Sequence, residues 1–377
     1  MSKYSIVMTI VYSAMAFGIC FCMIRPIAAR KIVKIAAYAI VILCAAMAIS
    51  YLHLRRAELL PGYFEDVFAL MIGAVFTLFI AALLSDWAIR VARRVYKSDR
   101  FDNKMRIGAL VVSFAYLAYG FFSATTAPNI KEVAIETDRV KAPLTIAHLT
   151  DLHLGNGALL NQPFAARIKE QVEALKPDII VITGDLVDAR LNKIKLALQE
   201  IAKTKSKYGI YFASGNHENY SNAIEAMDYL DSLGIKVLRN ESVRVGGDFG
   251  EIDIAGILDY SGKRLGVLLP NAKKTLRDVK ADNFVVVLAH QPISIYDFEP
   301  QSFDLMLNGH THGGQIFPFN LLVRFAQPYL AGLYQHDDRA KVYVSRGVGY
   351  WGPPLRMFAP NEIAFITIKP PLDSAKL

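Results

Sequence analysis

Cysteine is scarce in this chain, and the position of each cysteine limits what it can do. The 377 residues include three cysteines, Cys20, Cys22 and Cys44, all in the apolar first third. No disulfide can therefore staple the polar remainder, and no thiolate is available there as a metal ligand. The cysteine content therefore does not indicate whether the chain works in an oxidising or a reducing compartment.

Asp, Glu, Lys, Arg and His are absent from the interior of four long apolar runs, at 4–24, 35–52, 67–85 and 107–126. Each run is about long enough to cross a bilayer as a helix, which takes about 20 residues. Ion and proton pathways need ionisable groups inside the membrane, so the runs predict an anchor and argue against a transporter. A cleaved signal peptide explains the first run poorly, because it is long for an h-region and three more runs follow.

The excess of positive charge lies in the same part of the chain. Residues 1–124 hold 14 Lys+Arg against 6 Asp+Glu, whereas residues 125–377 hold 28 of each, so the first part carries the whole formal charge of +8. These basic residues flank apolar runs and form no patch on the polar part, so nucleic-acid binding is not expected.

The connections between the runs predict the orientation in the membrane. The first and third connections together carry eleven Lys and Arg residues, and the second carries two. The positive-inside rule then places the polar domain on the extracytoplasmic side of the cytoplasmic membrane. If one of the four runs does not span the membrane, the same rule places the polar domain in the cytoplasm.

The rest of the chain predicts an α/β domain. We expect a transmembrane anchor over 1–126, a linker over 127–143 and a catalytic domain over 144–370. Apolar, β-branched runs predict strands at 144–150, 179–183, 210–214, 252–257, 284–289, 304–308, 341–345 and 362–368. Helical patterns fall at about 163–175, 191–202 and 222–233. Such alternation indicates mixed sheets covered by helices, and the chain contains no internal repeat or heptad run.

Side chains of the metal-binding kind follow several of these predicted strands. They occur in the motifs Asp151-Leu152-His153, Gly184-Asp185, Gly215-Asn216-His217-Glu218, Ala289-His290 and Gly309-His310-Thr311-His312. Neighbouring strand ends meet at one edge of an α/β sheet, so these groups can share cations. Residues two apart at an extended strand end, such as Asp151 and His153, point to the same side. Each motif alone is more often turn chemistry, but their joint occurrence in this order favours a metal site.

The ordered motifs closely resemble the calcineurin-like metallophosphoesterase superfamily. The resemblance covers about residues 144–369, and the segments 313–315, 343–349 and 354–356 are similar to its membrane-associated YkuE and YaeI type branch. It implies a four-layer αββα sandwich with mixed sheets and a site for two metal ions.

The resemblance also implies a role for each motif residue. The first metal would be bound by Asp151, His153 and His312. The second would be bound by Asn216, His290 and His310, with Asp185 bridging the two. His217 would act as general acid on the leaving group, with Glu218 as its orienting partner.

Hydrolysis of a phosphodiester, phosphomonoester or pyrophosphate bond by metal-activated hydroxide follows from such a site, with no covalent intermediate. Imidazole and carboxylate ligands without thiolate favour Mn, Fe, Co or Zn over Mg. Manganese is the first expectation, because the resembling branch is often manganese-dependent. Arg346 and Arg356 are candidates for clamping the phosphate, or they pair with surface carboxylates.

The motifs leave the substrate open. The apolar stretches 317–325 and 350–358 contain large residues that either meet a lipid or pack in the core. The short tether to the anchor favours a lipid-linked or envelope phosphoester. One alternative is a UDP-2,3-diacylglucosamine pyrophosphatase-like lipid A enzyme, although that reaction takes place on the cytoplasmic face. Another is a non-catalytic metal-binding sensor or scaffold of the same fold, which the intact His217 argues against. The oligomeric state is not indicated.

Overall fold

The computed structural model describes residues 3–55 and 59–371. The chain divides into two compact units. The helical unit comprises Met1–Thr125 with the segments Gly157–Leu159 and Gly352–Met357. The α/β unit comprises Thr126–Asn156, Leu160–Trp351 and Phe358–Leu377. Each unit is described by itself.

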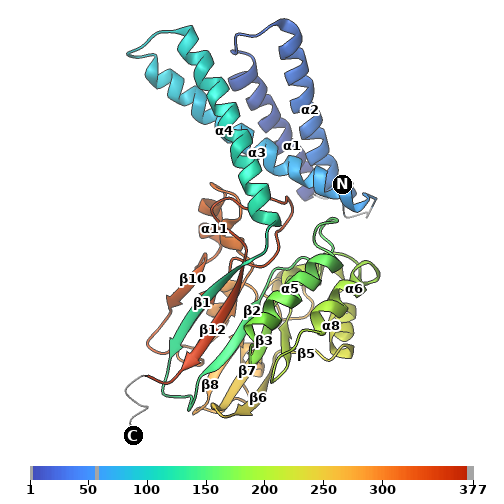
Figure 1. The fold of residues 1–377 in the computed structure, drawn as a ribbon, viewed down its shortest axis with the longest axis vertical. Coiled ribbons are helices and arrows are strands. Elements are labelled where there is room, and N and C mark those ends of the chain that lie inside the picture. The colour runs from blue at the N-terminus through green and yellow to red at the C-terminus, as the bar shows by residue number, and fades with distance from the viewer. Residues whose placement is uncertain (1–2, 56–58, 372–377) are drawn as a thin grey trace. The chain divides into compact units, whose positions relative to one another are not determined.

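The helical unit contains four long helices, shown in Figure 1. They are α1 (Lys3–Ile19), which continues into the π-helical turn η1 (Cys20–Ile24), α2 (Lys31–Leu54), α3 (Gly62–Ala92) and α4 (Asp99–Thr125). All four are long and apolar enough to cross a membrane, over Ser5–Ile24, Lys31–Tyr51, Gly62–Ala92 and Asp99–Thr125. The four spanning helices expected from the sequence are therefore confirmed by length and composition.

Helices α3 and α4 extend beyond the apolar runs that predict them, and the added turns carry paired charges. Asp86 accepts a hydrogen bond from Arg90 at 2.6 Å and lies 3.4 Å from the guanidinium of Arg106. Arg93 pairs with Asp99 at 2.8 Å. Such pairs let a helix continue past its apolar segment without leaving buried charge uncompensated.

The α/β unit is built on two six-stranded mixed sheets, as the sequence predicts. The first sheet has the order β1-β12-β2-β3-β4-β5. Its strands are β1 (Asn129–Glu136), β12 (Glu362–Lys369), β2 (Leu144–Leu149), β3 (Ile179–Thr183), β4 (Ile210–Ala213) and β5 (Lys236–Val237). Strands β2 to β5 run parallel, while β12 is antiparallel to β2 and parallel to β1.

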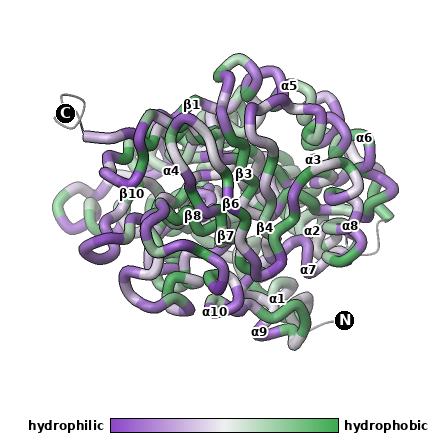
Figure 2. The backbone as a smooth tube through the Cα atoms, turned by 90° about the horizontal axis from the view of Figure 1, so that it is seen from below, coloured by the Kyte–Doolittle hydropathy of each residue, from purple (hydrophilic) through white to green (hydrophobic). Residues whose placement is uncertain are grey.

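The second sheet has the order β10-β11-β9-β8-β7-β6. Its strands are β10 (Gly332–Gln335), β11 (Lys341–Val344), β9 (Leu305–Asn308), β8 (Phe284–Leu288), β7 (Gly250–Gly256) and β6 (Glu241–Gly247). The four inner strands are parallel, and the edge strands β10 and β6 are antiparallel to their neighbours. Figure 2 shows hydrophobic strand residues in the middle of the unit and hydrophilic loops around its periphery.

The main core lies between the two sheets. Buried side chains such as Ile146 and Val181 from the first sheet and Ile254 and Leu305 from the second belong to one hydrophobic cluster. Both faces of each sheet are covered, which is why the strands read as nearly continuous apolar runs.

Helices cover the outer faces of the sheets unequally. Figure 1 shows α5 (Gln162–Leu175), α6 (Leu191–Ala202) and α8 (Ala223–Ser232) along the first sheet. The second sheet is covered by loops and short helical elements that supply Ile295, Phe298 and Phe303 to a separate cluster. These short elements are α9 (Gly262–Leu265), α10 (Ala272–Thr275) and η2 (Pro292–Asp297). The expected four layers are thus present, the last of them built from turns.

Strand β1 lies inside the segment that the sequence analysis assigns to a linker. Val133 and Ile135 alternate with exposed residues and bury their side chains in the core between the sheets. This alternation lets β1 form an edge strand against β12. The direct connection from α4 to the sheet is therefore only residues 126–128.

Candidate metal centre and active site

The predicted metal ligands all follow the carboxyl ends of strands that neighbour one another. Asp151 and His153 follow β2, Asp185 follows β3, and the adjoining loops are bonded backbone to backbone. The amide of Asp151 donates to the carbonyl of Gly184 at 3.1 Å, and that of His153 donates to Asp185 at 2.9 Å. In the second sheet, the amide of Gly309 donates to the carbonyl of His290 at 2.9 Å. Strand pairing thus continues into the ligand loops.

Left-handed backbone conformations aim these side chains. The φ angles lie between 49° and 69° at Asp151, His153, Asp185, His310 and His312. Each such residue costs roughly 1 kcal/mol or more in an L-amino acid, so the surrounding hydrogen bonds must hold it in place. The shared direction of Asp151 and His153 therefore comes from a turn and not from the alternation of an extended strand.

Gly184 allows two of these loops to touch. Its φ is 77°, and a Cβ at this position would lie 2.4 Å from the amide nitrogen of Gly215. Any other residue would force apart the loops that carry Asp185 and Asn216. The glycine before the carboxylate is therefore needed for close backbone approach.

The first group of potential ligands consists of Asp151, His153 and His312, all buried. One donor atom from each lies within 4.8 Å of the others. The Nε2 atoms of His153 and His312 are 3.1 Å apart, and Nε2 of His312 is 3.3 Å from Oδ1 of Asp151. Asp151 is fixed by the amide of His310 at 3.0 Å and the hydroxyl of Thr150 at 2.9 Å.

The second group consists of Asp185, His290 and His310. Nε2 of His290 lies 3.0 Å from Oδ2 of Asp185 and 3.2 Å from Oδ1 of Asn216. Oδ2 of Asp185 is also 3.9 Å from Nε2 of His153, a member of the first group. Asp185 therefore lies between the two groups, and its two oxygens suit a bridging role.

The donor chemistry around His290 fits a bound cation. Nδ1 of His290 is 2.8 Å from the carbonyl oxygen of Thr183, so this nitrogen must donate. In the neutral ring Nε2 then carries a lone pair that faces two oxygen acceptors, those of Asp185 and Asn216. Converging acceptors without a donor are satisfied by a metal ion, with Thr183 fixing the ring as an outer partner does in metal sites.

The charges of the ligands agree with this chemistry. Burial alone would lower the pKa of His290, but the adjoining Asp185 carboxylate raises it well above its usual range, which marks a site that attracts positive charge. Burial, together with His290, lowers the pKa of His310 to about 3, so this imidazole is neutral. Burial opposes ionisation of Asp151, yet His312 holds its pKa well below the usual range. A set of two carboxylates, several imidazoles and one amide suits two divalent ions.

His217 is held at the edge of the ligand groups by an acidic partner that the sequence analysis did not identify. Nδ1 of His217 is 2.6 Å from Oδ1 of Asp188, and the amide of His217 donates to Oδ1 of Asp185 at 2.8 Å. Nε2 of His217 lies 4.0 Å from Oδ2 of Asp185. The pattern that could have found Asp188 is its spacing, three residues after Asp185 in the same loop.

Glu218 has a different set of contacts. Its two buried oxygens accept four backbone N–H groups, from Gly215 at 2.6 Å, Asp185 at 3.0 Å, Leu186 at 2.8 Å and Val187 at 2.9 Å. Burial and then the Asp185 charge raise the pKa of Glu218 to about 7, and the amides of Val187 and Gly215 oppose this rise. Glu218 therefore fixes the Asp185 loop against the short helix α7 (Asn216–Ser221), while Asp188 is the partner of the His217 ring.

The two candidate substrate arginines lie in different surroundings. Arg346 forms an ion pair with Glu362 at 2.9 Å and remains partly exposed. Arg356 is fully buried and belongs to the segment Gly352–Met357, which is assigned to the helical unit. A fully buried guanidinium is inaccessible to a ligand, whereas Arg346 is partly exposed, so Arg346 is the better placed of the two.

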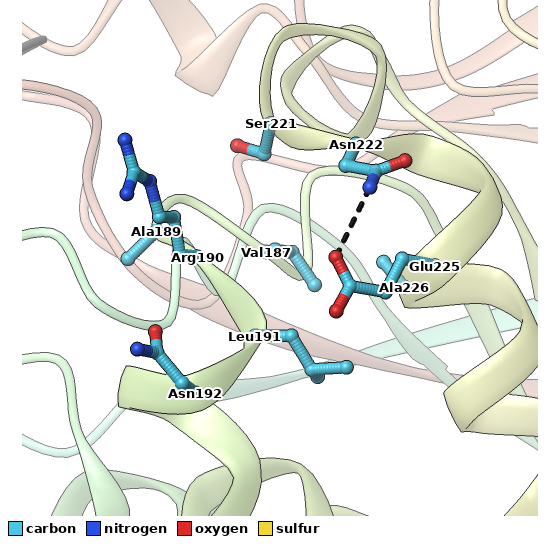
Figure 3. Close-up of a pocket in the computed structure, with 9 residues that line it drawn as sticks. All are labelled: Val187, Ala189, Arg190, Leu191, Asn192, Ser221, Asn222, Glu225 and Ala226. Carbon is cyan, nitrogen blue, oxygen red and sulfur yellow. Dashed lines mark hydrogen bonds between the residues drawn. The ribbon is translucent and has the colours of Figure 1, made fainter.

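A cavity of about 420 Å³ is lined by residues on both sides of Asp188 in the sequence. Its walls are drawn in Figure 3 and consist of Val187, Ala189, Arg190, Leu191, Asn192, Ser221, Asn222, Glu225 and Ala226. Val187 and Ala189 flank Asp188 in sequence, and Ser221 ends the helix that begins with Asn216. Asn222 donates to Glu225 at 3.0 Å across one wall. The lining mixes polar and apolar side chains.

Two mixed sheets that gather carboxylates, imidazoles and an amide at their strand ends define a metal-dependent phosphoesterase. The family model described as calcineurin-like phosphoesterase matches residues 144–314. The chain belongs to this family, as its motifs indicate.

Similar proteins occur in bacteria and animals. An "Uncharacterized metallophosphoesterase" of Helicobacter pylori is 40% identical over 269 residues, 71% of this chain and 71% of that protein. An "Uncharacterized metallophosphoesterase" of Campylobacter jejuni is 34% identical over 342 residues, 89% of this chain and 90% of that protein. A "Transmembrane protein with metallophosphoesterase domain" of Danio rerio is 32% identical and covers 74% of this chain and 66% of its own length. With the four apolar helices, these relatives indicate a membrane protein.

Proposed function

We propose that this chain is a membrane-anchored hydrolase that cleaves a phosphoester at a centre of two metal ions. The first ion is held by Asp151, His153 and His312, and the second by Asn216, His290 and His310, with Asp185 between them. The observation that carries this proposal is the convergence of acceptor atoms from Asp185, Asn216 and His290, which only a cation or a proton satisfies.

When bound, two such cations would hold the phosphate, lower the pKa of a water molecule and neutralise the charge of an in-line displacement. The protein's own residues then do the rest. With Nδ1 of His217 donating to the Asp188 carboxylate, that charge stabilises the doubly protonated ring, whose Nε2–H can then be given to the leaving oxygen. Glu218 acts as a positioning residue, because it ties the loop of Asp185 to the helix of Asn216 and His217.

The donor set limits the class of metal ion that the centre can hold. Oxygen and imidazole donors without sulfur suit Mn, Fe, Co or Zn. Among these we propose Mn, because the branch that the motifs resemble is often manganese-dependent. A non-catalytic sensor or scaffold would need these ligands but not the pairing of His217 with Asp188 at 2.6 Å. This pair favours the enzyme.

For the substrate we propose a phosphodiester or pyrophosphate that is lipid-linked or located in the envelope, with Arg346 as the candidate for contacting it. The short connection at residues 126–128 keeps the α/β unit close to the membrane that the helices span. A UDP-2,3-diacylglucosamine pyrophosphatase-like activity stays as the alternative for a cytoplasmic orientation.

The full chain purified in detergent with Mn is expected to hydrolyse bis-p-nitrophenyl phosphate and to lose this activity to a chelator. If the substrate is lipid-linked, a phosphodiester carried on a lipid in mixed micelles should be cleaved with a kcat/KM at least about tenfold higher than the soluble diester, which corresponds to about 1.4 kcal/mol. Both rates are measured on one preparation. Equal kcat/KM values for the two diesters would contradict a lipid-linked substrate. If neither diester were hydrolysed, the proposal that the chain is a phosphoesterase would be wrong.

The orientation is proposed to be extracytoplasmic, because the basic connections lie between the first and second helices and between the third and fourth. An impermeant protease added to spheroplasts is then expected to digest the α/β unit, as detected with an antibody to that unit. A cytoplasmic marker protein must stay intact in the same sample. Protection of the unit until the cells are lysed would place it on the cytoplasmic side.

A further inference from the structure

Six large apolar side chains are exposed together on one part of the α/β unit. We call them the apolar patch: Phe317, Phe319, Leu321, Leu322, Phe325 and Phe358. Phe325 is 89% exposed, Phe358 70% and Leu322 59%. The rings of Phe317 and Phe358 lie 6.2 Å apart, so the two sequence segments meet. Single exposed apolar residues are ordinary on proteins, whereas a cluster of this size marks a surface that is used.

Core packing does not account for the patch. None of the 7 residues of α11 (Asn320–Ala326), all of which the structure describes, is buried. Phe358 has a φ of 61°, a conformation that a bulky residue rarely adopts, and it directs a large ring into solvent. The helix also exposes Arg324 among its apolar residues. Apolar and basic side chains on a short exposed helix are the composition that binds at a membrane interface.

The patch lies near the point where the α/β unit joins the chain of α4. The side chain of Asn361 donates to the carbonyl of Thr126 at 3.2 Å, and the amide of Asn129 donates to the carbonyl of Asn361 at 3.0 Å. Phe358 precedes Asn361 by three residues, which span at most about 11 Å. Residue 126 directly follows the last residue of a helix apolar enough to cross a membrane. The patch therefore lies close to the residue at which the α/β unit is joined to the last apolar helix.

The patch is also joined to the metal-ligand loop. His312 opens the short helix η3 (His312–Gly314), and a Cβ at Gly314 would lie 2.2 Å from the Cβ of Asn320, the first residue of α11. Gln315 holds Trp351 through two hydrogen bonds, of 2.8 Å and 2.9 Å. A change in the position of α11 would therefore also displace the loop that carries His312.

We propose that the apolar patch inserts into the interface of the same bilayer that the four helices span. The bilayer, and not a second copy of the chain, is the occupant because the patch adjoins the chain's exit from a spanning helix. Arg324 would meet lipid phosphates while the neighbouring rings enter the boundary between head groups and acyl chains. This proposal concerns location and does not require catalysis.

The test uses the full chain in lipid nanodiscs and the depth of single tryptophans. The two natural tryptophans, Trp87 and Trp351, are replaced by Phe, and Phe325→Trp or Leu322→Trp is added. The matched control is Ile224→Trp on α8, a site that is 59% exposed, as Leu322 is. Emission is recorded in nanodiscs with and without lipids brominated near the top of their acyl chains.

We expect bromolipids to reduce the emission of Phe325→Trp and Leu322→Trp by roughly half or more, because an interfacial side chain is buried about 5–10 Å into this boundary. Ile224→Trp should be unaffected. Equal quenching at patch and control sites would overturn the proposal. Blue-shifted but unquenched emission at the patch would also overturn it and would indicate a second protein chain as the occupant. Because fluorescence needs no turnover, an inactive enzyme would leave this result intact.

Discussion

Asp185→Asn is expected to remove bound metal and nearly all phosphoesterase activity. Asp185 lies between the two ligand groups, with Oδ2 at 3.0 Å from His290 and 3.9 Å from His153. Asparagine keeps the shape but loses the negative charge and one of the two oxygens, and its amide hydrogens would face an imidazole lone pair. Loss of an outer partner of a metal ligand already costs roughly 10- to 100-fold in affinity, so loss of a bridging carboxylate should exceed this. Metal content per chain, measured by mass spectrometry, and kcat for bis-p-nitrophenyl phosphate test the prediction.

Asp248→Asn is the control for the loss of a carboxylate. Asp248 is exposed and lies 3.6 Å from Lys207 at the surface, so its charge contributes little. This variant should keep its metal and its rate. If Asp185→Asn retained two metals per chain at the same affinity, Asp185 would not be a ligand, and the assignment of Asp185 as the bridging residue would be wrong.

The strands and the motifs could be predicted from the sequence because burial on both faces leaves a plain pattern. Runs such as 179–183 and 284–288 are wholly buried, and each is followed by its polar motif at the strand end. Burial of a whole strand forces an apolar run, and a metal ligand interrupts it. The four spanning helices were predictable for the same reason, since a bilayer requires long uncharged segments.

The geometry of the ligands could not be predicted, because it depends on backbone conformations that sequence does not favour. Asp151, His153 and His312 adopt left-handed conformations that only tertiary hydrogen bonds can hold. The partners of His217 and Glu218 were hidden for a related reason. Asp188 reaches His217 across two loops, and Glu218 accepts amides of the Asp185 loop, contacts that sequence separation conceals.

Two further elements show how tertiary context decides between similar patterns. Residues 129–136 have only two alternating buried side chains and become a strand because β12 offers a free edge. Residues 320–326 are apolar enough for a core helix, yet no residue of α11 is buried. The sequence shows which segments are apolar, but only the fold shows whether their side chains are buried in the protein core or exposed at its surface.

His217→Ala is expected to keep the metal ions and to lose roughly 10²- to 10⁴-fold in kcat, the usual range for a positioned general acid. Nδ1 of its ring is 2.6 Å from Asp188. The ring does not take part in the close contacts that Nε2 of His290 makes with Asp185 and Asn216. The loss should be greatest for substrates with poor leaving groups, which need the proton most. A p-nitrophenyl ester and an alkyl ester compared on the same variant separate this role from a structural one.

Asp188→Asn should lower the rate in the same direction, because the amide no longer stabilises the protonated ring, and His336→Ala serves as the control. His336 is an exposed histidine bonded to Tyr329 at 2.9 Å, so its removal should leave both metal content and rate unchanged. A ligand atom of His217 lies within 4.8 Å of one from His153 and one from Asp188, so these three residues could also hold a metal ion. If His217→Ala also lost metal, His217 would be such a ligand. If it kept full activity towards the alkyl ester, the proton would have to come from another group. Retained metal with an activity loss that depends on the leaving group is the one outcome that a general acid produces.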